Sequence, residues 1–259
     1  MPTVKIAVLG ASGRMGRSLR EQIEDDPELK LSGAWQRSAA SNSGPQLISN
    51  ELSVALAGAD IAVDFSLAAA QADVLSHCLA LKMPLVCGVT GLNAVDLERL
   101  GRAAKEIPLL YDTNMSAGVH VLAELVRRAA SLLGDSYDAE VFEAHHRRKL
   151  DAPSGTAIKL GEAVAEGHGT ELSEKAVWSR HNASCARAPG EIGFSVVRGG
   201  DIVGEHTVYL AGTSERLELT HRAQSRSVFS AGALRAAKWL VGQPAGSLYT
   251  MGDALNLTS

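Results

Sequence analysis

The chain opens with an apolar run that leads directly into a glycine-rich turn. Residues 4–10 read VKIAVLG, which is typical of a buried strand, and residues 10–16 read GASGRMG. A turn without bulky side chains lets backbone N–H groups approach a pyrophosphate, and the start of the following helix adds partial positive charge. Glycines at such a turn can also serve packing alone, and their spacing is GxxGxxG rather than the commoner GxGxxG. The strand and helix around them nevertheless favour a dinucleotide site.

Short β-branched runs alternate with longer amphipathic stretches through the first half of the chain. The strand-like runs are VKIAVLG, LSGAW, IAVDF, LVCGV and LLYDT, and helices are expected from about Gly13, Ala68 and Ala94. Such alternation predicts parallel strands joined by crossover helices. The runs at 61–65 and 85–89 are almost entirely apolar, as expected where helices cover both faces of the sheet.

The pattern changes after residue 114. Residues 116–133 repeat apolar positions at helical spacing, AEVFEA alternates as a strand, and another helix is expected over 154–166. The segment 167–190 is rich in small residues and suits a long surface loop. IGFSVVR, DIVGEHTVYLA and ERLELTHRA then follow as strand-like runs joined by turns, which is typical of an antiparallel sheet. Residues 225–241 return to a helical period.

These patterns predict two domains of the α/β class. Residues 1–114 and 225–259 are expected to form a Rossmann-type dinucleotide-binding domain, with the C-terminal helix rejoining the first half. Residues 115–224 are expected to form a smaller α+β domain.

Composition excludes several broad classes of function. The net charge of −4 over 259 residues gives no general attraction to nucleic acid or to anionic membranes. No apolar run approaches the roughly 20 residues of a membrane helix, and the opening run is a strand rather than a secretory signal, so a cytoplasmic protein is expected. Cys78, Cys87 and Cys185 are odd in number and lack Cys-x-x-Cys spacing. We expect all three to be buried as small hydrophobic side chains, not as a disulfide or zinc site.

Residues 143–157 read EAHHRRKLDAPSGTA and concentrate proton-transfer groups beside cations. Adjacent histidines such as His145 and His146 diverge on a strand or helix, and no metal-binding histidine spacing occurs, so no metal site is expected. Nucleophilic catalysis is equally unsupported, because the chain has no GxSxG elbow and no cysteine near a histidine in sequence.

The end of this segment is suited to anion binding. Ser154 can cap the expected helix, and Gly155 and Thr156 would then place backbone N–H groups and a hydroxyl at its positive end. Together with Lys149 these groups could hold a carboxylate or two. A capped helix preceded by a solvated basic loop is the simpler alternative, but it leaves the histidine pair unexplained.

The end of the second strand departs from the usual dinucleotide pattern. An acidic residue commonly binds the adenosine ribose there, whereas this chain has Gln36 and Arg37. An arginine at a strand end is most often only solvated, but beside a ribose pocket it could pair with a 2′-phosphate. We therefore expect NADPH to be used at least as well as NADH.

The segment at 143–156 resembles the signature of the 4-hydroxy-tetrahydrodipicolinate reductase family, formerly called dihydrodipicolinate reductases. The family pattern runs Glu-x-His-His-x-x-Lys-x-Asp-x-Pro-Ser-Gly-Thr. The resemblance extends along the chain to GASGRMG at 10–16, VDFS at 63–66, CGVTG at 87–91, NMSAGV at 114–119 and RGGDIVGEH at 198–206.

The resemblance implies reduction of a cyclic imine dicarboxylate at C4 by NADH or NADPH in lysine and diaminopimelate biosynthesis. His145 would be the general acid, and Lys149 a second proton donor that also binds a substrate carboxylate. His146, Ser154, Gly155 and Thr156 would bind the rest of the substrate. The residues implied to line the cofactor, together with those at the end of the second strand, are Gly10, Ala11, Ser12, Gly13, Arg14, Met15, Gln36, Arg37, Gly88, Val89, Thr90, Asp112, Thr113, Asn114 and Met115. The family also implies a homotetramer joined through the second domain.

Two positions depart from the family pattern. Where the family has a Gly-Thr-Thr motif, this chain has Val89 in place of the first threonine. Met115 stands where the family often has an aromatic residue. Both departures bear on the nicotinamide contacts. A diaminopimelate or homoserine dehydrogenase of similar architecture is an alternative, as is an NAD(P)H sensor without turnover. His206 in GDIVGEH receives no catalytic role.

Overall fold

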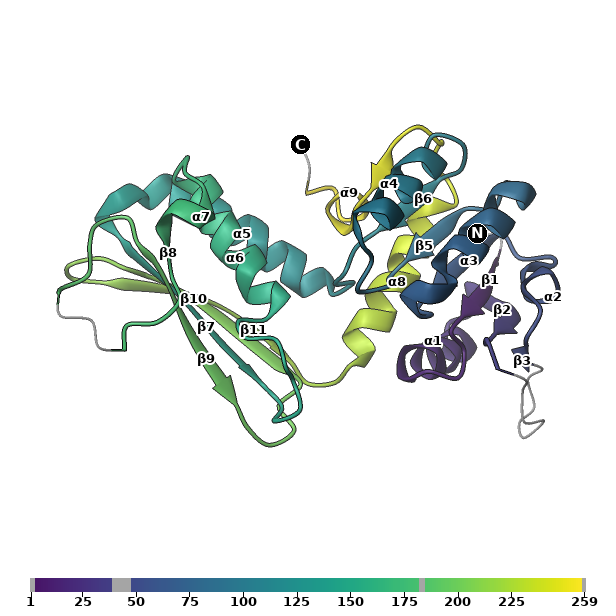
Figure 1. Cartoon of the computed structure of the whole chain (residues 1–259), viewed down its shortest axis with the longest axis horizontal. Helices are drawn as coiled ribbons and strands as arrows, with labels where there is room; N and C mark the ends of the chain where they lie inside the picture. The colour runs from purple at the N-terminus through teal and green to yellow at the C-terminus, as the bar shows by residue number, and fades with distance from the viewer. Residues whose placement is uncertain (1–2, 39–47, 182–184, 258–259) are drawn as a thin grey trace. The chain divides into compact units, whose positions relative to one another are not determined.

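The computed structural model describes residues 3–38, 48–181 and 185–257, and it divides into two compact units. The first unit contains Met1–Ala117 and Arg226–Ser259, and the second contains Gly118–Ser225. The sequence placed the corresponding boundaries after residues 114 and 224. Each unit has its own sheet and its own core (Figure 1).

The first unit is a parallel sheet with the strand order β12-β6-β5-β4-β1-β2-β3. Its strands are β1 (Val4–Leu9), β2 (Leu29–Trp35), β3 (Ile48–Ser49), β4 (Ile61–Asp64), β5 (Leu85–Cys87), β6 (Leu109–Tyr111) and β12 (Leu248–Tyr249). From β1 the chain proceeds to β2 on one side and later to β4 on the other. This reversal of strand order is the point at which doubly wound sheets bind their ligands, at the carboxyl ends of the strands. The predicted Rossmann-type architecture is confirmed.

Helices cover both faces of this sheet. Alternate residues of β1 point to opposite sides, so that Ala7 and Leu9 join one core while Ile6 and Val8 join the other. The first core is closed by α2 (Leu52–Leu56), the 3₁₀ turn Ala68–Ala70, α3 (Gln71–Leu81) and α4 (Ala94–Ala103). The second core is closed by α1 (Arg14–Asp25), α8 (Ser227–Leu240) and α9 (Met251–Ala254).

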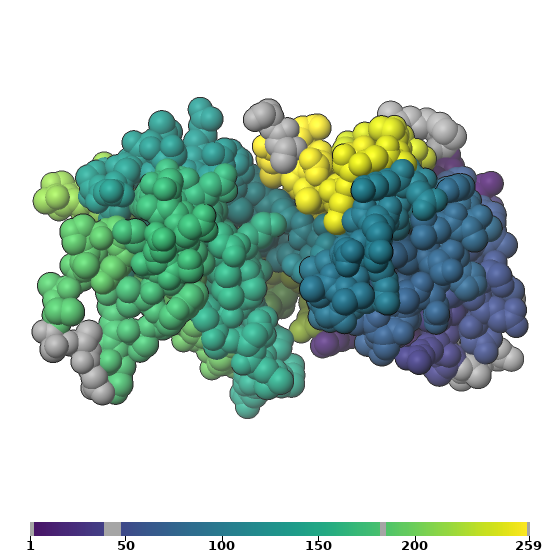
Figure 2. Space-filling view, turned by 45° about the horizontal axis from the view of Figure 1, so that its top comes forward, coloured from purple at the N-terminus to yellow at the C-terminus, as the bar shows by residue number. Residues whose placement is uncertain are grey.

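The C-terminal segment packs onto the first unit, as the yellow and blue surfaces in Figure 2 show. Helix α8 lies so close to the backbone after β6 that a Cβ at Gly232 would be 1.7 Å from the carbonyl oxygen of Met115. A side chain at this position would force the two segments apart. The helix predicted over 225–241 therefore forms part of the core of the first unit.

The second unit is a mixed sheet with the strand order β11-β10-β7-β9-β8. Its elements are α5 (Ala117–Leu133), the 3₁₀ turn Gly134–Ser136, β7 (Asp138–His145), α6 (Gly155–Gly167), α7 (Leu172–Lys175), β8 (Ala176–Val177), β9 (Ile192–Arg198), β10 (Gly204–Ala211) and β11 (Arg216–Ala223). Side chains from α5, α6 and one face of the sheet form its core.

Three expectations about this region were wrong in part. The three late strands do not form one antiparallel run, because β7 lies between β9 and β10 and pairs in parallel with β9. Only β10 and β11 form the expected hairpin. The segment 167–190 contains α7 and β8, whose pairing with β9 no local pattern indicates. Cys185 is exposed, whereas Cys78 and Cys87 are buried as expected.

Candidate functional site

The glycine turn after β1 is shaped by two close backbone approaches. Gly10 has φ +80°, and a Cβ there would lie 2.6 Å from the carbonyl oxygen of Phe65. A Cβ at Gly16 would lie 2.2 Å from the carbonyl oxygen of Gly10. Side chains at either position would push the first turn of α1 away from β1 and β4, so these glycines are required for the turn itself.

The start of α1 offers N–H groups to an anion. Gly13 is the N-cap residue and supplies no side-chain acceptor, so the first-turn N–H groups of Arg14, Met15 and Gly16 have no capping partner. Gly10 and Ala11 instead donate their N–H groups to the carbonyl oxygen of Trp35, at 3.0 and 2.8 Å. The free end of the helix therefore fits a pyrophosphate.

A pocket of about 440 Å³ lies beside this turn, at the point where the strand order reverses. The residues that line it come from the ends of β1, β2 and β4: Gly10, Ser12, Gly13, Trp35, Gln36, Arg37, Ser38, Phe65, Ser66, Leu67 and Ala70. Gln36 and Arg37 therefore lie where the sequence placed them. Arg37 is exposed and makes no ion pair with any residue that the structure describes. Its guanidinium is available to a ligand phosphate.

The remaining predicted cofactor residues follow β5 and β6. Gly88 donates its N–H to the carbonyl oxygen of Asp64 at 2.9 Å, and a Cβ there would meet the Phe65 ring at 2.5 Å. Thr90 is exposed, and the segment 112–115 turns through a hydrogen bond of 3.1 Å from the Asn114 N–H to the Asp112 carboxylate. These residues share the carboxyl edge of the sheet with the glycine turn.

The two departures from the family pattern are packing residues. Val89 is 1% exposed and joins one core of the first unit, and Met115 is 1% exposed and joins the other. Their side chains are enclosed by neighbouring apolar groups. Contacts of these two positions with a cofactor are therefore limited to their backbone atoms.

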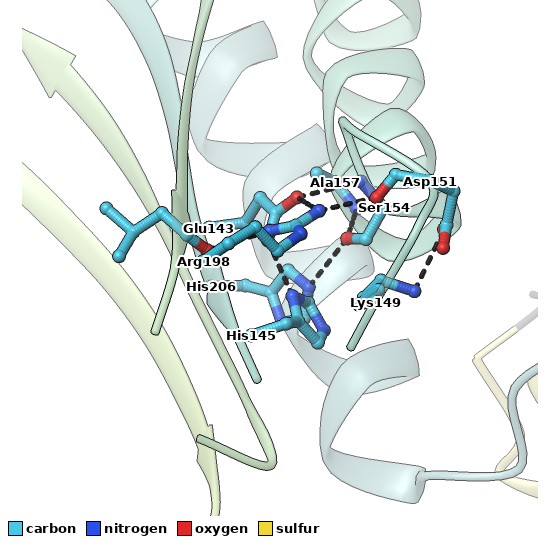
Figure 3. A network of polar contacts seen from close by, with 9 residues as sticks. Glu143, His145, Lys149, Asp151, Ser154, Ala157, Arg198 and His206 are labelled. Carbon is cyan, nitrogen blue, oxygen red and sulfur yellow. Dashed lines mark hydrogen bonds and ion pairs between the residues drawn. The ribbon is translucent and has the colours of Figure 1, made fainter. Parts of the chain in front are cut away.

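A second constellation forms in the other unit around the carboxylate of Glu143, which is completely buried (Figure 3). Its Oε2 lies 2.5 Å from His145 Nδ1 and 2.7 Å from Arg198 Nη1. Its Oε1 accepts hydrogen bonds from Arg198 Nη2 at 2.7 Å and from the Ser154 N–H at 2.9 Å. One carboxylate thus joins β7, β9 and the start of α6.

The charge of Glu143 is compensated within this cluster. Burial raises the pKa of the Glu143 carboxyl, but hydrogen bonds from Arg198, His145 and the Ser154 backbone outweigh burial and hold that pKa below its usual range. For His145, burial lowers the pKa, and the neighbouring Glu143 carboxylate only partly restores it. The two directions agree with an ionised glutamate beside an imidazole that is mostly neutral at pH 7 in the unliganded protein.

Lys149 lies in the loop between β7 and α6. Its Nζ is 2.8 Å from the Asp151 carboxylate, and its side chain is 23% exposed. The ion pair with Lys149 helps to hold the pKa of Asp151 below its usual value against the effect of burial. The loop also contains a cis peptide bond between Ala152 and Pro153. Lys149 therefore presents a cation beside His145 that a bound carboxylate can reach.

The start of α6 has the cap that the sequence predicted. Ser154 Oγ accepts the Ala157 N–H at 3.2 Å and lies 3.1 Å from His206 Nε2. Ser154 is 1% exposed, and its hydroxyl contacts both the Ala157 N–H and His206. Ser154 therefore stabilises the turn from its buried side. Gly155 and Thr156 are more exposed and present the first-turn N–H groups of α6.

His206 is a residue of the site that sequence reasoning passed over. Its ring lies 5.0 Å from that of His145 in an edge-to-face arrangement. Burial lowers the pKa of His206 to about 3, so that it remains neutral at physiological pH. Arg198 was also missed. The signal for both is strand register, since Arg198 is the β9 partner of His145 and His206 the β10 partner of Glu143.

The buried His206 makes a testable contribution to acid sensitivity. Its pKa is about 3 in the folded chain and near 6.5 when unfolded, so the unfolded state binds the proton first as pH falls. The contribution of His206 to the free energy of unfolding is fully present above pH 6.5. It declines between pH 6.5 and about 3, by up to roughly 1.4 kcal/mol per pH unit. Urea unfolding across this range is expected to show a flatter pH dependence for His206→Gln than for the parent. Parallel curves would contradict this role.

Two further observations concern the described residues as a set. No three histidine, cysteine, aspartate or glutamate side chains among them gather in a way that could hold a metal ion. Within the same residues, none of the helices combines the length and apolar character needed to span a membrane.

Comparisons with known proteins identify the family. Residues 4–115 match the model of the dihydrodipicolinate reductase N-terminus, and residues 118–255 match that of the C-terminus. The chain is 45% identical to 4-hydroxy-tetrahydrodipicolinate reductase of Pseudoalteromonas translucida, with 98% of each chain covered. It is 46% identical to the enzyme of the same name from an Anaeromyxobacter species, with 99% of each covered.

A solved structure supports the fold. The dipicolinate-bound dihydrodipicolinate reductase of Paenisporosarcina sp. TG-14 matches with a TM-score of 0.75 and 20% identity, and the match covers 96% of this chain and 97% of that one. With both units matched by family models and relatives similar over their full length, this chain belongs to the dihydrodipicolinate reductase family.

Proposed function

We propose that this chain reduces 4-hydroxy-tetrahydrodipicolinate to tetrahydrodipicolinate with NADPH or NADH, in lysine and diaminopimelate biosynthesis. Family membership supports this reaction. The observation that carries it in the structure is the pairing of His145 with the buried Glu143 carboxylate, next to Lys149 and the start of α6. These are a proton donor and an anion site for a cyclic imine dicarboxylate.

The overall chemistry requires a hydride, a proton and the loss of water. Elimination of the 4-hydroxyl group as water leaves a conjugated imine, and the reduced nicotinamide supplies the hydride that C4 accepts. The electron pair displaced by this addition moves onto the carbon-nitrogen system, which a proton then neutralises. His145 is proposed to deliver that proton from Nε2, because Nδ1 is directed to Glu143.

Anionic groups of the substrate are proposed to bind around this acid. Lys149 would exchange its contact with Asp151 for a substrate carboxylate and act as a second proton donor. Gly155 and Thr156 would hold the other carboxylate at the positive end of α6, and His146 would contribute a further polar contact to the substrate. Ser154 would contribute by fixing this turn through its cap. A bound dianion would also raise the pKa of His145 and favour its acid form.

The first unit is proposed to bind the cofactor. The helix start at residues 13–16 would receive the pyrophosphate, with Gln36 and Arg37 at the adenosine ribose. The segments 88–90 and 112–115 follow neighbouring strands at the same sheet edge and would contact the nicotinamide half. We further propose that the second unit binds the substrate.

Arg37 provides a test of cofactor preference. Arg37→Ala is expected to lower kcat/KM for NADPH about 10-fold and leave the value for NADH nearly unchanged, because only NADPH carries the 2′-phosphate. Charge-assisted hydrogen bonds contribute about 1.5–3 kcal/mol, and exposure of the site reduces this through screening. Steady-state kinetics with both cofactors measures the effect. Equal losses for the two cofactors, or a strong NADH preference in the parent, would show that Arg37 does not read the phosphate.

The function itself is tested by NADPH oxidation in the presence of the preceding synthase's product, prepared in situ because the compound is labile. Substrate-dependent oxidation is expected. Homoserine and meso-diaminopimelate, offered with NADP⁺, distinguish the dehydrogenase alternatives. Cofactor binding without NADPH oxidation by the imine substrate, and without NADP⁺ reduction by either amino acid, would instead favour an NAD(P)H sensor.

A homotetramer in the cytoplasm is the proposed state of the protein. The second unit's sheet exposes Val196, Val197 and Leu217 by 38–41% on β9 and β11. Because consecutive residues of a strand point to opposite faces, Val196 and Val197 leave apolar side chains partly exposed on both faces, where another copy of the chain can contact them. Light scattering on the purified protein determines the number of subunits.

A further inference from the structure

Both carboxylate oxygens of Glu143 are hydrogen-bonded beside the proposed acid His145. Its two oxygens receive two bonds from Arg198, one from the Ser154 N–H and the contact with His145. A buried carboxylate is costly unless it is paired and hydrogen-bonded, and this one is both. Its neighbours are also the groups that the proposed reaction uses.

We propose that Glu143 is a positioning residue, which fixes the ring tautomer of His145 and ties that ring to the anion-binding start of α6. This inference rests on the proposed function of the same site. It assigns Glu143 no contact with the substrate, because the side chain is completely buried beneath His145 and Ser154.

The tautomer follows from hydrogen-bond chemistry. An ionised carboxylate only accepts hydrogen bonds, so the 2.5 Å contact requires the proton to reside on His145 Nδ1. The exchangeable proton of the acid form is then on Nε2, at the opposite side of the ring. Gly204 is the neighbour there, and even a Cβ at that position would lie only 3.1 Å from Nε2. The absence of a side chain at Gly204 keeps this nitrogen accessible.

Arg198 keeps Glu143 in the ionised state that this arrangement needs. Its guanidinium binds the carboxylate through two parallel hydrogen bonds of 2.7 Å each. It also donates to the backbone carbonyl of Asp151 at 2.5 Å, and Asp151 in turn pairs with Lys149. The same carboxylate–guanidinium pair therefore anchors both ends of the loop that follows His145 and carries Lys149.

The groups facing His145 determine the direction of the pH effect. They are Glu143 on β7, Arg198 on β9, His206 on β10 and Lys149 in the loop before α6, with His221 on β11 beyond His206. Glu143 alone among them favours the protonated imidazole. Removing its charge is expected to lower the pKa of His145 further, so less of the acid form remains at neutral pH.

Kinetics of Glu143→Gln distinguish positioning from a purely structural role. Glutamine keeps the shape and removes the charge, so kcat at pH 7 is expected to fall about 10- to 100-fold, part of the effect of losing a general acid. The decline of kcat with rising pH is expected at lower pH than in the parent, with the KM for NADPH unchanged. Glu140→Gln is the matched control, because Glu140 also lies on β7 but pairs with Arg180 and Arg187. An unchanged kcat and pH profile in a folded Glu143→Gln variant would overturn the inference.

The tautomer can be read in the parent protein, so the test does not depend on the variant folding. Ring ¹⁵N shifts of labelled histidines, with His145 identified by its loss in His145→Gln, are expected to show a proton on Nδ1 of the neutral form. A proton on Nε2 in that form would overturn the inference. Substrate-dependent NADPH oxidation by the parent tests the proposed function separately. An inactive parent with an Nδ1–H ring would remove the function while the Glu143–His145 arrangement stands.

Discussion

Replacing His145 with glutamine is expected to lower kcat about 10²- to 10⁴-fold, the usual contribution of a general acid. His145 is 8% exposed and its ring is held by Glu143, so the ring position is fixed before substrate arrives. Glutamine retains hydrogen bonding but has no group that titrates near neutral pH. Steady-state oxidation of NADPH at saturating substrate measures the loss, and cofactor fluorescence is expected to show an unchanged dissociation constant.

The same substitution at an exposed histidine provides the control for this experiment. His181 is exposed in the second unit, and His181→Gln is expected to leave kcat within twofold of the parent. In the parent, kcat is expected to decline as pH rises through the His145 pKa of the substrate complex, because only the protonated ring donates. A His145→Gln enzyme with parental kcat at saturating substrate would remove the acid role.

Replacing Lys149 with alanine is expected to lower kcat/KM about 10²-fold. A charge-assisted hydrogen bond to a carboxylate contributes about 1.5–3 kcal/mol, or about 10- to 150-fold in affinity, and the loss of a second proton donor would add to this. Both KM for the substrate and kcat are expected to change, since a carboxylate is bound in the ground state and charge develops during reduction.

Arg148 is the matched control for Lys149. It is the adjacent cation, pairs with Asp201 at 2.8 Å and has a side chain that is 69% exposed. Arg148→Ala makes the same change in net charge without removing a group near His145, and its kcat/KM is expected to stay within a factor of about 2. If Lys149→Ala changed only the affinity for NADPH, Lys149 would belong to the cofactor site instead.

Local sequence was sufficient for the main strands and helices of the first unit. The strand, glycine turn and helix at its start are adjacent in the chain, and alternation of short and long apolar patterns predicts parallel strands without knowledge of their partners. It was insufficient for the short elements β3, α2, β12 and α9, which contain two to five residues each. Elements of that length are stabilised by the sheet and helices onto which they pack.

The sequence by itself determined which chain segment carries the proposed proton donors and the proposed anion site, because His145, Lys149 and the start of α6 lie within about a dozen consecutive residues. It also identified the family through those motifs. Only the tertiary structure decided what surrounds them. Arg198 and His206 are separated from Glu143 by 55 and 63 residues, and they meet it because β7 lies between β9 and β10. Strand order depends on which apolar faces pack together over the whole unit. A local pattern, which gives each strand's faces but not its neighbours, leaves that order undetermined.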